Sequence, residues 1–409
     1  MNATLKKWLQ ISIASLLIVS AIGIVLRYKI AFSLPFVDQK NLLHGHSHFA
    51  FAGWVTQALM ALLVNYLFEN GQVEAFKKYR FLLIANLVTA YGMLISFPVV
   101  GYSFISILFS TLSIFVSYAF AIQYWRDLKR LNKNTTSSWF KAAIFFNAIS
   151  SLGAFSLAYM LATHHFNERF YLGSIYFFLH FQYNGWFFFA CMGLFNNRIS
   201  HLGISSTGLK NVFRFFFYAS IPAYFLSAPW IPIPSWAYWI VVLAAVTQLT
   251  GWGQLVKLLA NNKEAFKNDV GLFSFRVFIL VGIALTIKLL LQALSVIPPL
   301  SQLAFGFRPI VVGYLHLVLL GVISLFIINY IVTYTTSRNN TLQLGLQVFI
   351  FGIVLNEGLL MIQGVGDLYY LPIPSINLYL FIVAPIIFLG ILLLNLGLRN
   401  SKYERTHNV

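Results

Sequence analysis

Long apolar segments recur along the whole chain and are separated by short polar connections. Each segment is about 20 residues long, which an α-helix needs to cross about 30 Å of hydrocarbon. The pattern predicts twelve membrane-spanning helices, near residues 9 to 27, 46 to 68, 81 to 100, 103 to 125, 140 to 162, 173 to 195, 213 to 229, 236 to 258, 276 to 296, 310 to 333, 343 to 363 and 376 to 398. The run from 81 to 125 is nearly continuous, and we divide it at Pro98 to Ser103, where Pro and Gly interrupt it.

Composition supports the same class of protein. Hydrophobic residues make up 59% of the chain and charged residues 9%, whereas soluble domains carry about 25% charged residues. The first apolar segment has no small-residue cleavage site after it, so we expect a retained span rather than a signal peptide. The sequence therefore predicts an all-α, polytopic membrane protein with a single helical domain over residues 1–409.

The basic residues predict how the helices are oriented. The net charge is +17, but Lys and Arg lie in short clusters between apolar segments, so we expect no nucleic-acid binding. With twelve spans, most of the 27 basic residues fall on one side, in clusters that begin at Lys6, Lys77, Arg126, Arg198, Lys257, Arg338 and Arg399. By the positive-inside rule both termini are cytoplasmic, and we expect the protein in the cell inner (plasma) membrane, with the lipid bilayer as its partner.

Three histidines lie within five residues at the start of the second predicted span: His44, His46 and His48. Imidazole is a standard ligand of heme, copper and zinc, and the only cysteine, Cys191, excludes a thiolate cluster or covalent heme attachment. If these residues are extended, all three side chains project to one side and could chelate copper or zinc. If they are helical, His44 and His48 share a face and His46 points away. The alternative is a polar cap where the helix enters lipid.

Two further histidines lie inside predicted spans. His180 has Tyr183 and Asn184 at positions i+3 and i+4, which makes a polar stripe on an apolar helix. His316 is surrounded by Leu and Val. Polar groups at membrane depth are costly, so both are functional candidates; the alternatives are a hydrogen-bonded core cluster for His180 and a bond from His316 to a backbone carbonyl or Tyr314.

Histidines of three different predicted spans are expected at a similar depth in the membrane. Even-numbered spans all run from outside to inside in this topology, so His46, His180 and His316 enter near their outer ends and lie at similar depth. His164 and His165 belong to the same side but are expected in a loop. His201 and His407 are expected to be ordinary cytoplasmic surface residues.

The second predicted span resembles a known family, the heme-copper oxidase superfamily catalytic subunit of the cytochrome-oxidase and nitric-oxide-reductase branches. His46-Ser-His48 with Gly53-Trp54 resembles the family's span-2 signature, in which the first histidine binds the low-spin heme. The resemblance covers most of the chain in span count and histidine placement. It implies that His46 is one heme ligand, with His48 as the second choice.

The tenth predicted span is similar to the same family. Tyr314-Leu-His316 with Gly321 stands where the family has His-x-His, whose second histidine binds the low-spin heme and whose first binds the high-spin heme. The resemblance therefore implies His316 as the other ligand of a low-spin heme b. Tyr314 replaces the high-spin heme ligand, and phenolate ligation of a second heme by Tyr314 is a further alternative.

The copper centre of the family is incomplete in this sequence. His180 resembles the span-6 copper ligand, but residues 215–230, where the family has a His-His pair, contain no histidine. Two axial imidazoles leave no open position on a heme, which favours electron transfer over gas chemistry in a degenerate oxidoreductase. Arg27 and Arg308 are candidate partners of the heme propionates, and a redox partner or additional membrane subunit would complete the electron path.

Other functions compete with a heme protein. A transporter or permease could use a polar site of His180, Asn184, Lys288 and Glu357. Lys288, with Glu357 and its neighbour Asn356, could also form a proton route, a cofactor anchor or a salt bridge that fixes packing. A di-iron membrane enzyme would need cytoplasmic histidine clusters. A terminal oxidase would need copper held by His164, His165 and His180 together.

Overall fold

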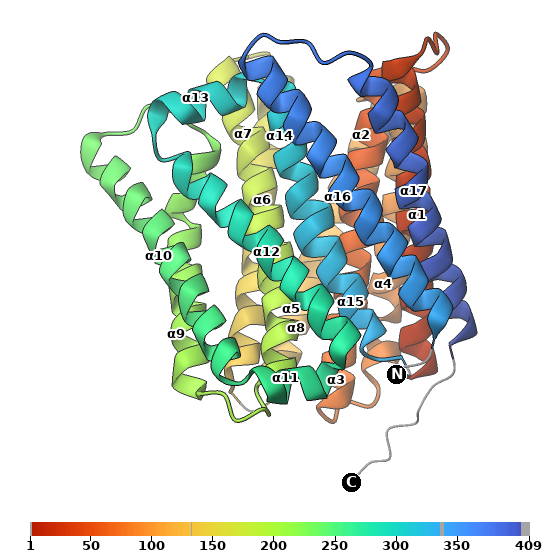
Figure 1. Cartoon of the computed structure of the whole chain (residues 1–409), viewed down its shortest axis with the longest axis vertical. Helices are drawn as coiled ribbons and strands as arrows, with labels where there is room; N and C mark the ends of the chain where they lie inside the picture. The colour runs from red at the N-terminus through yellow and green to blue at the C-terminus, as the bar shows by residue number, and fades with distance from the viewer. Residues whose placement is uncertain (1, 132, 336–338, 402–409) are drawn as a thin grey trace. The chain divides into compact units, whose positions relative to one another are not determined.

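The computed structural model describes residues 2–131, 133–335 and 339–401, without the side chains of residues 303 and 304. Every regular element in these ranges is helical, as predicted (Figure 1). Within them, ten helices are long and apolar enough to cross a membrane: α1 Ala3–Ala31, α2 with η1 and α3 Gln39–Glu69, α4 Ala75–Val100, α5 Phe104–Leu128, α6 Thr135–Thr163, α10 Ser235–Asn261, α12 Leu272–Leu294, α14 with η4 and α15 Arg308–Val332, α16 Asn340–Leu368 and α17 Ile376–Asn400.

The division of the long apolar run is confirmed. Helix α4 ends at Val100 and α5 begins at Phe104. Gly101 between them has φ of +59°, in the left-handed region that favours glycine, and a Cβ there would lie 2.8 Å from Oδ1 of Asn41. Pro98 stands in the last turn of α4, where it helps to end the helix.

The sixth and seventh predicted spans differ from the other ten. The sixth is helical throughout, as α7 Glu168–His180, η2 Phe181–Phe187 and α8 Phe188–Ile199, but its His, Gln, Asn and Tyr side chains make it less apolar. In place of the seventh, α9 Ser206–Ser220 ends before Pro222, and a 3-10 helix, η3 Pro222–Ser227, follows it. Proline has no N–H to continue the α-helical hydrogen bonds, so the predicted helix over 213 to 229 is interrupted. The twelve-span count is therefore not confirmed.

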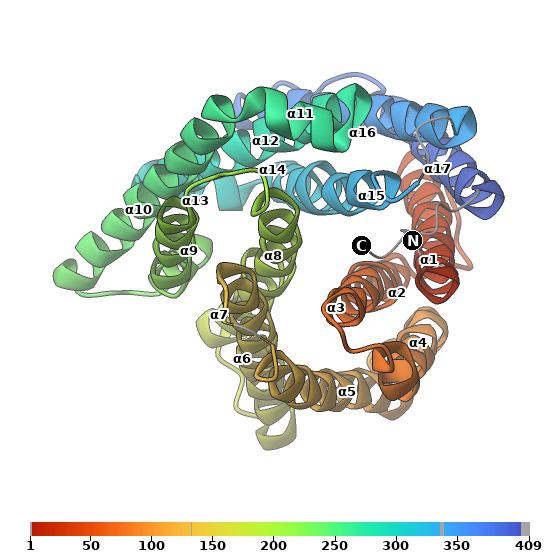
Figure 2. The ribbon, with the colours of Figure 1, turned by 90° about the horizontal axis from the view of Figure 1, so that it is seen from below.

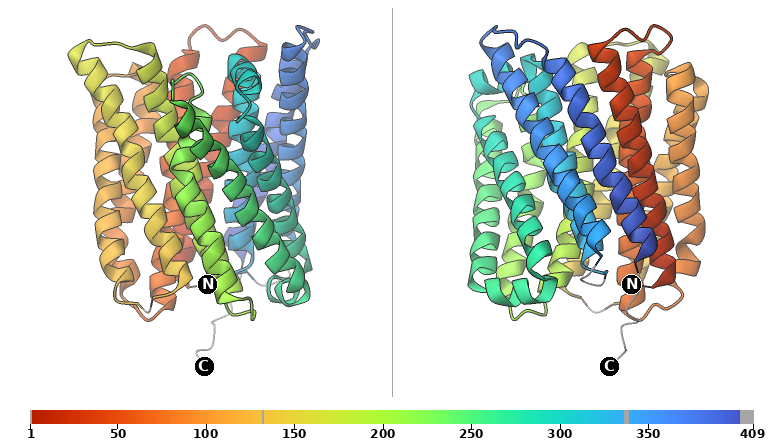
Figure 3. Two further views of the ribbon diagram at one scale, coloured as in Figure 1. Left: turned by 90° about the vertical axis from the view of Figure 1, so that its left-hand side faces the viewer. Right: turned by 45° about the vertical axis from the view of Figure 1, so that its right-hand side comes forward.

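The chain divides into two compact units. Unit 1 contains Met1–Phe120 and Ser324–Val409, and unit 2 contains Ala121–Ile323. In unit 1, α1 packs against α17, α17 against α16, and α2 against α4 (Figures 1 and 3). Helices α16 and α17 touch backbone to backbone, since a Cβ on Gly345 would lie 2.7 Å from the Leu394 nitrogen. Small residues allow such close packing between membrane helices.

Unit 2 contains the end of α5, the helices from α6 to α14 and η4 as far as Ile323. Helix α6 packs against α7 and α8, and α9 packs against α10, which also contacts α12 (Figure 2). Aromatic side chains fill the space between the first of these helices. Phe146 of α6 stacks on Phe181 with ring centroids 5.6 Å apart, and Trp139 lies 5.1 Å from Phe213. A short surface helix, α11 Lys263–Val270, connects α10 to α12.

Candidate functional site

The histidine-bearing helices share a rare backbone feature. Among the described residues there are three π-helical segments, η1 Ala50–Thr56, η2 Phe181–Phe187 and η4 Leu317–Ser324. η2 and η4 begin directly after His180 and His316, and η1 begins two residues after His48. π-Helical turns are rare and occur often at functional sites, because they shift the register of the side chains on a helix. The three helices that contain π-helical segments are thus the same three that carry the candidate histidines.

A common spacing accompanies the π-helical segments. His48, His180 and His316 are each followed five residues later by a glycine inside the segment. At Gly185 a Cβ would lie 2.6 Å from the Phe146 Cβ, so glycine is required for packing there. His-x4-Gly is the sequence signal that could have predicted these segments. In this register His48, rather than the preferred His46, is equivalent to the other two histidines.

The three clustered histidines lie on a helix, which is the second of the two conformations considered for them. α2 covers Gln39–Phe49, so His44 and His48 share a face. Both contact aromatic rings of unit 1: His48 stacks on Phe97 at 4.5 Å, and His44 meets Tyr102 edge-on at 4.7 Å. Across the described part of the chain, no group of three His, Cys, Asp or Glu residues could hold a metal ion. A single chelate of all three histidines is therefore not formed.

His46 faces α1 in the same unit. Its ring forms a hydrogen bond with the backbone of Val19, and its Cε1 lies 3.6 Å from the position that a Cβ on Gly23 would take. Within the described residues, His46 Nδ1 and His44 Nε2 are buried without a hydrogen-bond partner. Metal-bound histidines commonly have one ring nitrogen on the metal and the other bonded to a backbone carbonyl. The arrangement of His46 fits this pattern.

His180 is fully buried in unit 2, and both of its ring nitrogens have protein partners. Nε2 lies 2.9 Å from the Ser220 carbonyl oxygen, and Nδ1 lies 3.2 Å from both Ser227 Oγ and Asn184 Nδ2. A carbonyl only accepts, so Nε2 carries the proton and donates, while Nδ1 accepts from Asn184. This is the hydrogen-bonded core cluster considered as the alternative, and His180 could bind copper only by giving up one of these bonds.

The bond from His180 to Ser220 also explains how the chain tolerates a broken helix. α9 ends at Ser220, and the Tyr224 N–H, which would be the α-helical donor to the Ser220 carbonyl, bonds to the Ile221 carbonyl instead. Non-helical backbone at membrane depth needs such internal partners. The imidazole supplies one, and the Tyr224 hydroxyl in turn donates to the Gly173 carbonyl at 3.0 Å.

The polar residues Lys288 and Glu357 belong to different units. In unit 2, Lys288 Nζ donates to Gln292 Oε1 at 2.5 Å, and Gln292 Nε2 donates to Gln248 Oε1 at 2.9 Å. In unit 1, Glu357 accepts from Asn356 Nδ2 at 3.0 Å and interacts electrostatically with Arg27. Each residue thus has local partners within its own unit.

The remaining predicted residues lie as follows. Arg308, Tyr314 and His316 all belong to α14 Arg308–His316 of unit 2, and Tyr314 meets Tyr183 with ring centroids 6.4 Å apart. His164 and His165 follow the end of α6, which confirms that they are loop residues. His407 and Arg338 lie outside the described residues.

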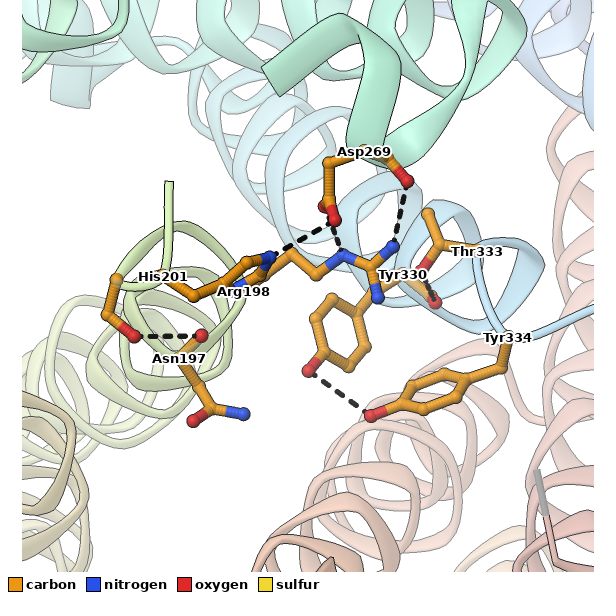
Figure 4. A network of polar contacts seen from close by, with 8 residues as sticks. Asn197, Arg198, His201, Asp269, Tyr330, Thr333 and Tyr334 are labelled. Carbon is orange, nitrogen blue, oxygen red and sulfur yellow. Dashed lines mark hydrogen bonds and ion pairs between the residues drawn. The ribbon is translucent and has the colours of Figure 1, made fainter. Parts of the chain in front are cut away.

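A second polar cluster of unit 2 lies at the end of α8. Figure 4 shows Arg198 and His201 both directed toward Asp269 from α11. Arg198 Nε lies 2.6 Å from Asp269 Oδ2, and His201 Nε2 lies 3.2 Å from Oδ1. His201 is exposed, as expected for a surface residue. The cluster ties α11 to the end of α8 and has the geometry of a structural ion pair.

Comparisons with known proteins do not assign a family. No protein-family model matches the chain, and no curated protein matches its sequence. The resemblance to heme-copper oxidases therefore depends on the predicted span count and the histidine motifs.

Proposed function

We propose that the protein is a membrane heme protein of the heme-copper oxidase type, which binds a bis-histidine low-spin heme b near the outer face of the plasma membrane. Its role is electron transfer or a related step of respiratory oxygen or nitric oxide metabolism. The proposal includes twelve spans with both termini cytoplasmic. The observation that carries it is the π-helical segment next to His48, His180 and His316, each with glycine at the same spacing.

The chain's own residues would hold the heme in defined roles. His316 supplies one axial imidazole, and His46 supplies the other, because its Nδ1 is buried and its ring is oriented by the Val19 backbone. His48 is the alternative second ligand on the basis of the His-x4-Gly register. Arg27, which interacts with Glu357, and Arg308 are the partners for propionates. The heme would supply one-electron redox chemistry.

Copper has no part in this proposal. Both nitrogens of His180 are occupied by protein groups, and His44 is separated from His46 by the geometry of α2. We assign His180 to the fold of unit 2. The proposed protein is thus a relative of the oxidases that keeps the electron-transfer heme and lacks the centre that reduces gas.

A reduced-minus-oxidised spectrum of purified protein, with pyridine hemochrome and metal analysis, tests the proposal. We expect a heme b spectrum and little copper in the wild type. His316→Ala should lose the Soret band, whereas His201→Ala, at the exposed surface cluster, should keep it. Colourless wild-type protein from heme-replete cells, or a Soret band unchanged in His316→Ala, would contradict the proposal.

A permease is the second candidate, favoured by one specific observation. Unit 2 contains three of its four polar residues, His180, Asn184 and Lys288, with His180 bonded to Asn184 and interacting electrostatically with Lys288. A permease predicts colourless protein and substrate-dependent flux in liposomes. Glu357, the fourth residue, belongs to unit 1.

A further inference from the structure

Lys288 is a buried lysine to which the described residues provide no counter-charge. Only 6% of the residue is exposed, on a helix apolar enough to span a membrane. Its partner is Gln292 Oε1, and Gln292 in turn donates to Gln248 on α10. Across residues 2–131, 133–335 and 339–401, no carboxylate lies within ion-pair distance of Lys288.

A second basic group lies near this lysine. His180 and Lys288 interact electrostatically, and the groups bonded to them are amides, hydroxyls and a carbonyl. Asn184, Ser227 and Gln292 are all neutral side chains. This part of unit 2 is therefore a basic polar cluster within an apolar helical unit, and the described residues place no acid in it.

The energetics of an isolated ammonium argue for a missing ligand. Burying an unpaired charge costs several kcal/mol, and intramembrane ionisable residues normally pair with one another. An ammonium has three N–H donors, of which Gln292 uses one. In the protonated form of Lys288, two donors and one positive charge therefore have no match among the described residues.

We propose that Lys288 is the anchor of a binding site for a monovalent oxyanion group, either a carboxylate or an inorganic ion such as nitrate. One negative charge balances the ammonium, and two oxygen atoms accept its two remaining donors. Gln292 is a positioning residue, because its amide fixes the ammonium and is itself fixed by Gln248. The inference names the ligand class of the site in the second candidate function and requires neither heme nor transport.

Thermal unfolding of the purified full chain in detergent tests the site. Sodium nitrate, sodium acetate and sodium oleate are titrated separately, at an ionic strength held constant with a bulky organic sulfonate. We expect a saturable rise of the unfolding midpoint, since a ligand that binds only the folded state stabilises it. A response to nitrate and acetate indicates a free anion, and a response to oleate alone indicates a lipid carboxylate; either supports the site.

Matched variants decide whether Lys288 is the anchor. Lys288→Met should weaken the apparent affinity at least tenfold, Lys288→Arg should keep most of it, and Lys257→Met, at an exposed position of α10, should leave it unchanged. Gln292→Leu keeps the lysine and should weaken binding severalfold, which tests the site even if Lys288→Met fails to fold. No saturable response in the wild type, or equal responses in wild type and Lys288→Met, would overturn the proposal.

The anion-binding test can fail or succeed independently of the tests of the two proposed functions. The heme spectrum of Lys288→Met should equal that of the wild type, because the lysine is not a heme ligand. Anion binding without flux in liposomes would remove the permease and leave the site in place.

Discussion

His46 of unit 1 and His180 of unit 2 are both imidazoles on apolar helices, yet their surroundings differ. His180 has a partner on each ring nitrogen, drawn from Ser220, Ser227 and Asn184. His46 bonds to the Val19 backbone through its ring and has a buried Nδ1 for which the described residues give no partner. A fully bonded imidazole belongs to the fold, whereas a buried open nitrogen is available for a ligand.

The largest expected difference between His46 and His180 is in the heme content of their alanine variants. His46→Ala should lower the heme bound per folded chain at least tenfold, because an axial ligand is lost. His180→Ala should leave that ratio unchanged. Pyridine hemochrome assays on monodisperse protein measure both. Equal loss in the two variants would remove the distinction, and loss in His48→Ala instead of His46→Ala would move the ligand to His48.

The reverse pattern is expected for stability. His180→Ala leaves the Ser220 carbonyl and the Asn184 amide without this partner, so we expect a loss of about 1–3 kcal/mol in the free energy of unfolding. His165→Ala, in an exposed loop, should change it by less than about 0.5 kcal/mol. Reversible unfolding in mixed micelles measures both values. An unchanged stability in His180→Ala would show that its bonds are not needed.

The glycines of the π-helical segments differ in how closely their neighbours pack against them. Gly185→Ala would place a Cβ 2.6 Å from Phe146 Cβ, and such overpacking costs about 1–3 kcal/mol. At Gly321 the nearest atoms are 3.5 Å away, an ordinary contact, so Gly321→Ala should be close to neutral for packing. Unfolding midpoints of the two variants test this difference. A neutral Gly185→Ala would mean that the neighbouring helix can move aside.

The smallest effect is expected at the surface cluster of Figure 4. Asp269→Asn removes the charge that pairs with Arg198 and His201, and partly exposed ion pairs contribute about 0.2–1 kcal/mol. The loss should shrink as salt is raised, because ions screen surface charges. A loss above that of His180→Ala, or one independent of salt, would contradict the assignment of this cluster as a partly exposed ion pair.

Part of this fold is predictable from local sequence. Apolar length predicted the ten helices that are long enough to span, and Pro98 with Gly101 predicted the break between α4 and α5. Pro222 was equally visible within the seventh predicted span, but average hydrophobicity outweighed it there. Proline and glycine act on single hydrogen bonds, whereas a hydropathy window averages over about 20 residues.

Local sequence patterns could not predict the hydrogen-bond partners of the site residues. Ser220 and Ser227 lie 40 and 47 residues after His180, and Gln248 lies 44 residues before Gln292. The sequence by itself determined a helical membrane protein, because apolar length and charge depend on residues near one another in the chain. Only the tertiary structure decided which imidazole has partners on both nitrogens and, among the described residues, which has an open nitrogen and which buried lysine has no acid nearby, because hydrogen bonds between helices depend on how the helices pack.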